Sequence, residues 1–374
     1  MKKLIAIILV CLLSVPAMAA EPQLQVNAPH AILMEKETGA VLFEKDADAP
    51  VAPASVTKVM TILLIVEALD RGEISLDDTV TASARASSMG GSQVYLKEGE
   101  CMSLRDMLKA IVVASGNDAA VAVAEYMCTT EEAFVERMNS RAEELGMKNT
   151  QFTNCTGLFD DDEHHISARD VAIMSRELIK HEIVKDYTTI WTDTLRDGEF
   201  GLANTNKLLR RYEGCTGLKT GFTTLAGYCL AATAQRDGAE YIAVVMGAAT
   251  SEERFNTAAQ LLDHAFSRYC LMELKPAEAI PPVRVVLGKI PTVQPEYQSG
   301  VYLLLPRDKK DSLSYEMQLP AQIDAPLSRG QSLGKIIVSL DGKKVAELDL
   351  MAPRAIEKRT PLNIFAELLA LVYG

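Results

Sequence analysis

Histidine, cysteine and the short motifs that build metal centres are scarce in this sequence. Its 374 residues include five histidines and seven cysteines, and neither a Cys-x-x-Cys pair nor a His-Glu-x-x-His motif occurs. Residues 160–165, Asp-Asp-Asp-Glu-His-His, are the densest group of potential ligands, but a polar surface loop explains this run better than a ligand set. The sequence therefore predicts no metal site and no cofactor.

Positive charge is also in short supply. Lysine and arginine number 38 against 50 aspartates and glutamates, which gives a formal net charge of -12. This balance argues against nucleic acid as a partner and against broad electrostatic attraction to anionic lipid.

A long apolar run is missing near the N-terminus. Residues 4–13 are almost wholly apolar, but they are too few for a stable membrane span. Lys2 and Lys3 precede this run and Ala17-Met18-Ala19 follows it, which is typical of a signal peptide with an Ala-x-Ala cleavage site. We interpret residues 1–19 as a signal peptide, and loss of its two lysines takes the net charge from -12 to -14. The mature protein is thus predicted to be exported.

Six cysteines remain in the mature chain, at Cys101, Cys128, Cys155, Cys215, Cys229 and Cys270. An even number permits disulfides in an exported protein, but the wide spacing is unlike that of a small scaffold held together by disulfides. We predict that most of them are buried thiols, and the sequence assigns no pairing.

A hydroxyl and an amine lie three residues apart in Pro53-Ala54-Ser55-Val56-Thr57-Lys58. The apolar run that follows predicts a buried helix with Pro53 as its start signal, so Ser55 and Lys58 share one face of the first turn. There the helix dipole favours a developing negative charge, and burial can lower the pKa of Lys58 until it accepts the hydroxyl proton. Ser332 and Lys335 have the same spacing, so the pair alone is a weak signal. A capping serine followed by a solvated lysine stays an alternative.

Periodicity along the chain predicts an antiparallel sheet packed against a helical cluster. The predicted fold class is therefore α/β in the broad sense, and more narrowly α+β. Residues 31–34 and 41–44 predict a hairpin. Helical spacing predicts helices over residues 55–69, 104–114, 119–127, 131–145 and 167–179. The apolar period then shortens towards two, which predicts strands over residues 188–195, 217–220, 228–234 and 241–246. A last amphipathic helix is expected over residues 252–269.

Proline punctuates the chain after residue 274 and separates short β-rich runs, which predicts a separate small β domain. At the C-terminus, Pro361 is followed by apolar residues at helical spacing: Leu362, Ile364, Phe365, Leu368, Leu369, Leu371 and Val372. This amphipathic helix is too short to span a bilayer, but it can lie in the membrane interface. We favour a membrane anchor, with docking on the protein as the alternative.

Two further motifs accompany the pair of Ser55 and Lys58. Ser115-Gly116-Asn117 offers a second hydroxyl and an amide at a break between helices, and Lys219-Thr220-Gly221 offers a second cation on a predicted strand. Each of these two motifs occurs once in the chain. The order Ser-x-x-Lys, Ser-x-Asn, Lys-Thr-Gly resembles the active site of the penicillin-binding protein and serine β-lactamase superfamily.

The resemblance is closest to the low-molecular-mass D-alanyl-D-alanine carboxypeptidases and extends over nearly the whole mature chain. The matching segments are residues 53–58, 114–119, 156–158 with His165, 168–170 and 217–221, and Arg254 falls where the family places an arginine. The resemblance implies a β-lactamase/transpeptidase-like catalytic domain in residues 20–275, a small all-β domain in 276–354 and an anchoring helix in 355–374.

The same resemblance implies a serine hydrolase that removes the terminal D-Ala from peptidoglycan pentapeptide stems and that β-lactam antibiotics acylate. The catalytic residues implied are Ser55, Lys58, Ser115, Asn117 and Lys219. The substrate-binding residues implied are Thr220, Gly221, Phe222 and Arg254. Such an enzyme would work at the extracytoplasmic face of the bacterial cytoplasmic membrane.

Two positions depart from the family pattern. Phe222 follows Lys-Thr-Gly where relatives often carry His, and Cys155 precedes Thr-Gly-Leu where Pro is usual. A serine β-lactamase stays an alternative, but it needs a deacylating carboxylate, for which Glu163 is the nearby candidate, and it leaves the β domain unexplained. A non-catalytic peptidoglycan-binding protein is the other alternative, which the intact serine and both lysines disfavour.

Overall fold

Five antiparallel strands form the central sheet of the computed structural model, which describes residues 24–158, 163–276 and 278–373. Their order in space is β2-β1-β9-β8-β7, so β7 lies at one edge. The strands are β1 His30–Glu35, β2 Val41–Lys45, β7 Cys215–Thr223, β8 Gly227–Arg236 and β9 Ala239–Ala248. The predicted hairpin is confirmed, with Leu33 opposite Phe43. The predicted signal peptide lies outside the described residues.

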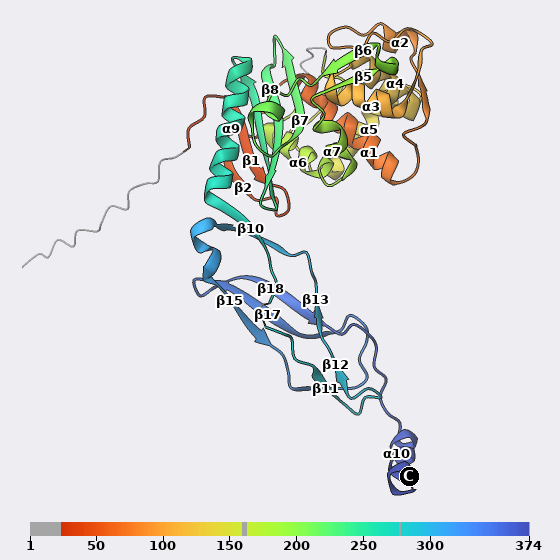
Figure 1. The fold of residues 1–374 in the computed structure, drawn as a ribbon, viewed down its shortest axis with the longest axis vertical. Coiled ribbons are helices and arrows are strands. Elements are labelled where there is room, and N and C mark those ends of the chain that lie inside the picture. The colour runs from red at the N-terminus through yellow and green to blue at the C-terminus, as the bar shows by residue number, and fades with distance from the viewer. Residues whose placement is uncertain (1–23, 159–162, 277, 374) are drawn as a thin grey trace, which may run out of the picture.

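Side chains of the inner strands alternate between the two faces of this sheet, as the pleat of a strand requires. Ile32 and Val244 pack into the apolar cluster on the helical side, whereas Leu33 and Val245 pack into the cluster under α9 (Ser251–Arg268). Figure 1 shows α9 on one side of the sheet and the helical cluster on the other. The predicted α+β architecture is thus confirmed.

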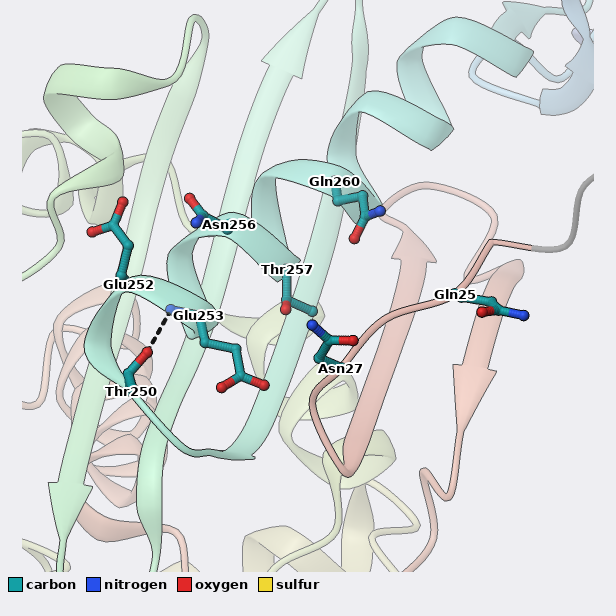
Figure 2. A pocket seen from close by; sticks show the side chains of 8 residues that line it. All are labelled: Gln25, Asn27, Thr250, Glu252, Glu253, Asn256, Thr257 and Gln260. Atoms are coloured by element: carbon teal, nitrogen blue, oxygen red, sulfur yellow. Dashed lines mark hydrogen bonds between the residues drawn. The ribbon is translucent and has the colours of Figure 1, made fainter.

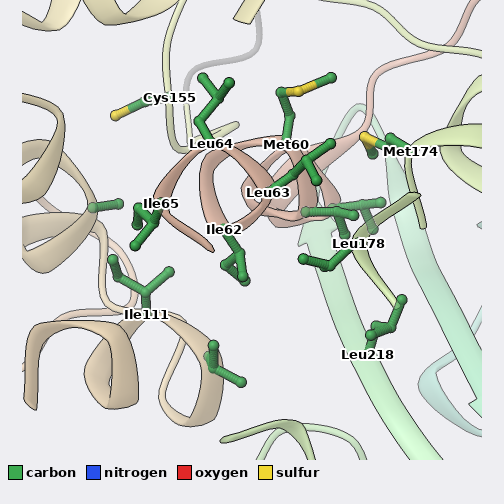
Figure 3. Close-up of a cluster of buried hydrophobic side chains, with 14 of the residues drawn as sticks. Met60, Ile62, Leu63, Leu64, Ile65, Ile111, Cys155, Met174, Leu178 and Leu218 are labelled. Carbon is green, nitrogen blue, oxygen red and sulfur yellow. The ribbon is translucent and has the colours of Figure 1, made fainter. Parts of the chain in front are cut away.

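The helical cluster surrounds α1, Lys58–Asp70. Every side chain from Lys58 to Val66 is buried, because apolar residues occupy all faces of this helix. Figure 3 shows Met60, Leu63 and Ile65 of α1 among side chains from neighbouring elements. Burial of each such side chain stabilises the fold by roughly 1.5–3 kcal/mol.

The remaining elements of this part surround α1 or connect its neighbours. The helices are α2 Ala84–Ser87, α3 Leu104–Val113, α4 Asn117–Cys128, α5 Glu131–Glu144, α6 Ala168–Leu178, α7 Ile183–Thr188 and α8 Leu208–Arg211. Two short antiparallel pairs join β3 Thr79–Thr81 to β4 Cys101–Ser103, and β5 Thr192–Leu195 to β6 Phe200–Ala203. The 3-10 turns are η1 Ala54–Thr57 and η2 Arg196–Gly198.

The predicted strand over residues 188–195 is wrong in its first half. Helix α7 runs to Thr188 and strand β5 begins at Thr192. The threonines and isoleucine at this point have strand propensity, but the Thr189 hydroxyl donates to the Lys185 carbonyl at 2.7 Å and closes the helix end instead.

The prediction of mostly buried thiols is also wrong. The six described cysteines are free, and two of them, Cys155 and Cys229, are buried. Cys101 is exposed, and the other three, Cys128, Cys215 and Cys270, are half-buried. Residue type alone therefore overestimated the burial of these four cysteines.

An elongated β-rich body follows α9 (Figure 1). Its sheets have the orders β13-β18-β17-β15 and β12-β11-β16, and β14 pairs with β10, the strand that directly follows α9. The strands are β10 Tyr269–Glu273, β11 Val283–Val286, β12 Thr292–Val293, β13 Glu296–Tyr297, β14 Tyr302–Pro306, β15 Leu313–Gln318, β16 Gln322–Asp324, β17 Ser332–Leu340 and β18 Lys343–Met351, with the 3-10 turn η3 Arg307–Ser312. The prediction of an all-β C-terminal domain is confirmed.

Helix α10, Pro361–Tyr373, ends the described chain at the far tip of this body (Figure 1). The predicted tail helix is therefore present, and its Leu362, Phe365 and Leu369 are exposed. Within the described ranges, no helix combines the length and the apolar character that crossing a bilayer requires.

Candidate active site

Ser55 lies in the 3-10 turn η1 rather than in the first turn of an α-helix, and α1 begins at Lys58. The tighter turn still places both side chains together, because residues i and i+3 eclipse in a 3-10 helix. Lys58 Nζ is 3.1 Å from Ser55 Oγ. The second Ser-x-x-Lys pair does not form such a contact, since Ser332 and Lys335 lie on strand β17 and Lys335 pairs with Glu347.

Lys58 is held by two further acceptors from distant parts of the chain. Its Nζ donates to Asn117 Oδ1 at 2.5 Å and to the Thr156 carbonyl at 2.9 Å. Asn117 Nδ2 donates in turn to the Gly90 carbonyl at 2.8 Å, which fixes the orientation of the amide. The structure thus brings together the first two predicted motifs and adds the Thr156 carbonyl, which the sequence did not indicate.

Burial sets the protonation of this amine. Lys58 is fully buried, and burial lowers its pKa from the usual 10.5 to about 7, although Cys155 and Asp118 act in the opposite direction. The Asp118 carboxylate accepts hydrogen bonds from the backbone N–H groups of Val94 and Leu96, so it is committed to a neighbouring loop. Lys58 can therefore be neutral near pH 7 and act as a base.

Ser115 sits in a strained position between α3 and α4. Its φ is +63°, in the left-handed region that a residue other than glycine rarely adopts. The side chain is buried, and its Oγ has no hydrogen-bond partner among the described residues. A buried hydroxyl without a protein partner is costly, so Ser115 is a candidate for contact with a substrate.

Strand β7 supplies the third motif. Lys219 is buried, and its Nζ donates to the Thr220 carbonyl at 3.0 Å. Burial first, and then the charges of Lys58 and Arg254, hold the pKa of Lys219 well below its usual value. A Cβ on Gly221 would lie 2.9 Å from the Pro53 carbonyl oxygen and 3.1 Å from Ser55 N, so glycine is required where β7 meets η1.

Arg254 and Phe222 flank this strand. Arg254 Nη1 donates to the carbonyls of Gly221 at 2.8 Å and Cys229 at 3.2 Å, while its buried Nε has no partner among the described residues. Phe222 is 54% exposed and its ring lies 4.3 Å from that of Tyr228. Arg254 thus holds the backbone of β7 to that of β8, and the Phe222 side chain packs on Tyr228.

The first turn of α9 places Arg254. Thr250 caps the helix by accepting a hydrogen bond from Glu253 N at 3.1 Å, as Figure 2 shows. A polar groove of about 490 Å³ lies between this turn and the segment of Gln25 and Asn27, and Figure 2 shows the side chains that line it. The described residues that line it include none of the predicted site residues.

The loop that contains His164 packs against η1, the turn that holds Ser55, and the sequence analysis did not predict this contact. His164 is buried, not part of a surface loop as predicted, whereas residues 160–162 of that run lie outside the described residues. Thr153 N donates to His164 Nδ1 at 3.0 Å, so Nε2 carries the proton and donates to Thr57 Oγ1 at 2.8 Å. A Cβ on Gly157 would lie 1.9 Å from the Ala54 carbonyl oxygen. The glycine of Thr-Gly-Leu is therefore needed for close packing against η1.

Comparisons with known proteins agree with this geometry. Residues 16–250 match the sequence profile of the D-alanyl-D-alanine carboxypeptidase family, and residues 275–358 match that of the C-terminal domain of penicillin-binding protein 5. D-alanyl-D-alanine carboxypeptidase DacF of Bacillus subtilis (strain 168) is 42% identical over 337 residues, which cover 89% of this chain and 86% of the relative.

Solved structures show the same likeness. Penicillin-binding protein 5 from Haemophilus influenzae has a TM-score of 0.77 at 30% identity, with 91% of this chain and 100% of that chain covered. Penicillin-binding protein D2 from Listeria monocytogenes, in its ampicillin-bound form, has a TM-score of 0.60 at 34% identity, with 66% of this chain and 100% of that chain covered.

The fold and the site define a serine hydrolase of the penicillin-binding protein superfamily. This chain belongs to the D-alanyl-D-alanine carboxypeptidase family. The sequence-based expectation of this hydrolase activity is confirmed, and neither the β-lactamase nor the non-catalytic alternative is favoured.

Proposed function

We propose that the enzyme removes the terminal D-Ala from peptidoglycan pentapeptide stems through an acyl-enzyme on Ser55. The arrangement of contacts at Lys58 is the observation that carries this proposal. A neutral lysine has two N–H bonds and one lone pair, and Asn117 Oδ1 and the Thr156 carbonyl can only accept. These acceptors take both protons, so the lone pair faces Ser55 Oγ at 3.1 Å.

Acylation then follows from the geometry. Lys58 takes the hydroxyl proton as Ser55 Oγ forms a bond to the carbonyl carbon of the penultimate D-Ala. The backbone N–H groups of Ser55 and Phe222 are the proposed donors to the oxyanion, which the close approach of β7 to η1 at Gly221 supports. The C–N bond breaks when the departing amine receives a proton through Ser115 and Lys219, and D-Ala leaves.

The terminal carboxylate of the substrate would lie beside the end of β7. Lys219 and Thr220 are the proposed direct partners of this carboxylate. Arg254 contributes mainly its charge, because its Nη1 is engaged by the Gly221 and Cys229 carbonyls. Water then adds its hydroxyl to the acyl carbon and returns the proton to Ser55. A β-lactam offers a strained amide and a carboxylate, so it acylates Ser55 by the same steps.

The other parts of the chain would place this chemistry at the wall. Residues 1–19 would direct export, 20–275 would form the catalytic domain, 276–354 a β-rich spacer, and 355–374 an anchor on the extracytoplasmic face of the cytoplasmic membrane. Exposure of Leu362, Phe365 and Leu369 supports lipid rather than protein as the cover of α10.

The direct test is incubation of the mature protein with a pentapeptide that ends in D-Ala-D-Ala, followed by detection of free D-Ala. We expect one equivalent of D-Ala per peptide and no second cleavage. Covalent labelling with a tagged penicillin in parallel distinguishes an acylated serine from adventitious hydrolysis. Rapid turnover of the penicillin without release of D-Ala would instead favour a β-lactamase.

A further inference from the structure

Thr205 lies beside the catalytic strand, and none of the three motifs includes it. Its Oγ1 is 2.6 Å from Oγ1 of Thr220, the threonine of the Lys-Thr-Gly motif. Thr205 is half-buried, whereas Asn204 and Asn206 on either side of it are buried. The turn over residues 204–206 therefore presents a single hydroxyl to the edge of β7.

The two asparagines fix this turn. Asn204 Nδ2 donates to the Ile190 carbonyl at 2.8 Å, and its Oδ1 accepts from Asn206 N at 2.9 Å. Asn206 Nδ2 donates to the Gly217 carbonyl of β7 at 3.0 Å. Because both side-chain amides bond to backbone groups, the position of the Thr205 hydroxyl relative to β7 is well determined.

The turn also limits where a substrate can lie. Strand β7 is at the edge of the sheet, so an extended peptide can align with it. Asn206 already occupies the Gly217 carbonyl, at the end of β7 that precedes Lys219 and Thr220. A peptide on this edge therefore has to end near Thr220, and under the function proposed above the end that lies there is the C-terminal carboxylate.

The direction of the hydrogen bond between the two threonines then decides how Thr220 receives a carboxylate. Each hydroxyl has one proton, so one of the pair donates and the other accepts. If Thr220 donated to Thr205, the carboxylate would meet a lone pair of Thr220. If Thr205 donates, the Thr220 proton can point at the carboxylate and form a charge-assisted hydrogen bond, which is the stronger kind.

We propose that Thr205 is a positioning residue that donates to Thr220 and thereby turns the Thr220 hydroxyl towards the terminal carboxylate of the substrate. This role rests on the function proposed above. It makes Thr205 a determinant of the preference for a free carboxylate, acting through Thr220 rather than on the scissile bond.

The test compares two peptides that end in D-Ala-D-Ala, one with a free carboxylate and one with a C-terminal amide. The wild type, Thr205→Val and Thr205→Ser are assayed for kcat and KM on both. Thr205→Val should lower kcat/KM for the acid roughly tenfold, mainly through KM, which is the scale of one hydrogen bond. Its kcat/KM for the amide should stay within about twofold, and Thr205→Ser should keep the wild-type preference.

Thr216→Val is the matched control, because its hydroxyl lies on the same strand pair but contacts Thr233 Oγ1 at 2.7 Å and Glu240 Oε1 at 2.8 Å rather than Thr220. Its preference for the acid should equal that of the wild type. Comparing the two peptides on one preparation cancels any change in the folded fraction, and acylation by a penicillin and by its methyl ester gives the same comparison with a covalent readout.

Three outcomes separate the possibilities. An unchanged preference in Thr205→Val overturns the role of Thr205, and so does an equal fall for both peptides, which is the result of a merely structural change. A wild type that releases no D-Ala from either peptide contradicts the proposed function itself, whatever Thr205 does.

Discussion

The rate of Ser55 acylation should follow the titration of Lys58. A lysine with its usual pKa of 10.5 is neutral in only about one molecule in 3,000 at pH 7, whereas a pKa of about 7 makes about half of the molecules competent. Burial of this amine thus raises the fraction of molecules with a neutral Lys58 at pH 7 by about three orders of magnitude. We expect the acylation rate constant to rise about tenfold per pH unit below pH 7, to be about a hundredfold below its plateau at pH 5, and to level off above pH 8.

The assay is stopped-flow acylation by a fluorescent penicillin between pH 5 and pH 9, with circular dichroism at each pH as a control for folding. Lys58→Arg should fold but acylate too slowly to measure on this scale, because guanidinium keeps its proton throughout the range. A flat profile from pH 5.5 to pH 8, or near-normal acylation by Lys58→Arg, would refute the assignment of Lys58 as the base.

The same pKa predicts how stability depends on pH. The pKa of Lys58 is lower in the folded state than in the unfolded state, so the unfolded chain binds more protons between the two values and stability rises with pH there. Between pH 7 and pH 9 the wild type should gain about 2 kcal/mol in free energy of unfolding relative to Lys58→Met. Urea unfolding of both proteins at the two pH values measures this difference. An equal change in the free energy of unfolding for both proteins would show that Lys58 is not desolvated.

Three further predictions use other parts of the chain. Ser55→Ala should abolish penicillin labelling without changing the circular dichroism spectrum, and persistent labelling would point to another nucleophile. Gly157→Ala should lower the free energy of unfolding by at least about 2 kcal/mol and slow acylation, since its Cβ would lie 1.9 Å from the Ala54 carbonyl oxygen. Gly72→Ala is the control, with a φ of +68° and no atom within 4 Å, and an equal loss in both would mean that strain alone matters. Truncation after Lys358 should leave activity on a soluble peptide unchanged but abolish sedimentation with vesicles, whereas lost activity would show that the tail belongs to the fold.

Much of the fold could be predicted because the spacing of apolar residues along the chain reflects which side chains are buried. An apolar period close to two predicted the strands of the sheet, in which Ile32 and Leu33 face opposite sides. The apolar run after Lys58 predicted the central helix. The prediction failed at Thr188 and Thr189, whose β-branched side chains favour a strand. The Thr189 hydroxyl instead closes the end of α7 on the Lys185 carbonyl, and the Thr188 hydroxyl donates to the Thr216 carbonyl of β7.

The candidate site could be predicted in part for a similar reason. Serine, lysine and asparagine at fixed spacing are recognisable in a sequence, and the structure brings Ser55, Lys58 and Asn117 into contact. The third partner of Lys58 is the backbone carbonyl of Thr156, 98 residues away, and a carbonyl has no signature in sequence. Thr205 was missed because Asn-Thr-Asn is typical of turns in general and does not indicate a functional site.

The site also shows why its substrate should carry a negative charge. Lys58, Lys219 and Arg254 are all buried, and the charges of Lys58 and Arg254 add to burial in holding the pKa of Lys219 well below its usual value. The nearby Asp118 is engaged by backbone N–H groups and does not pair with Lys219. A carboxylate that bound beside Lys219 would raise the pKa of this amine again, because an opposite charge favours the charged form.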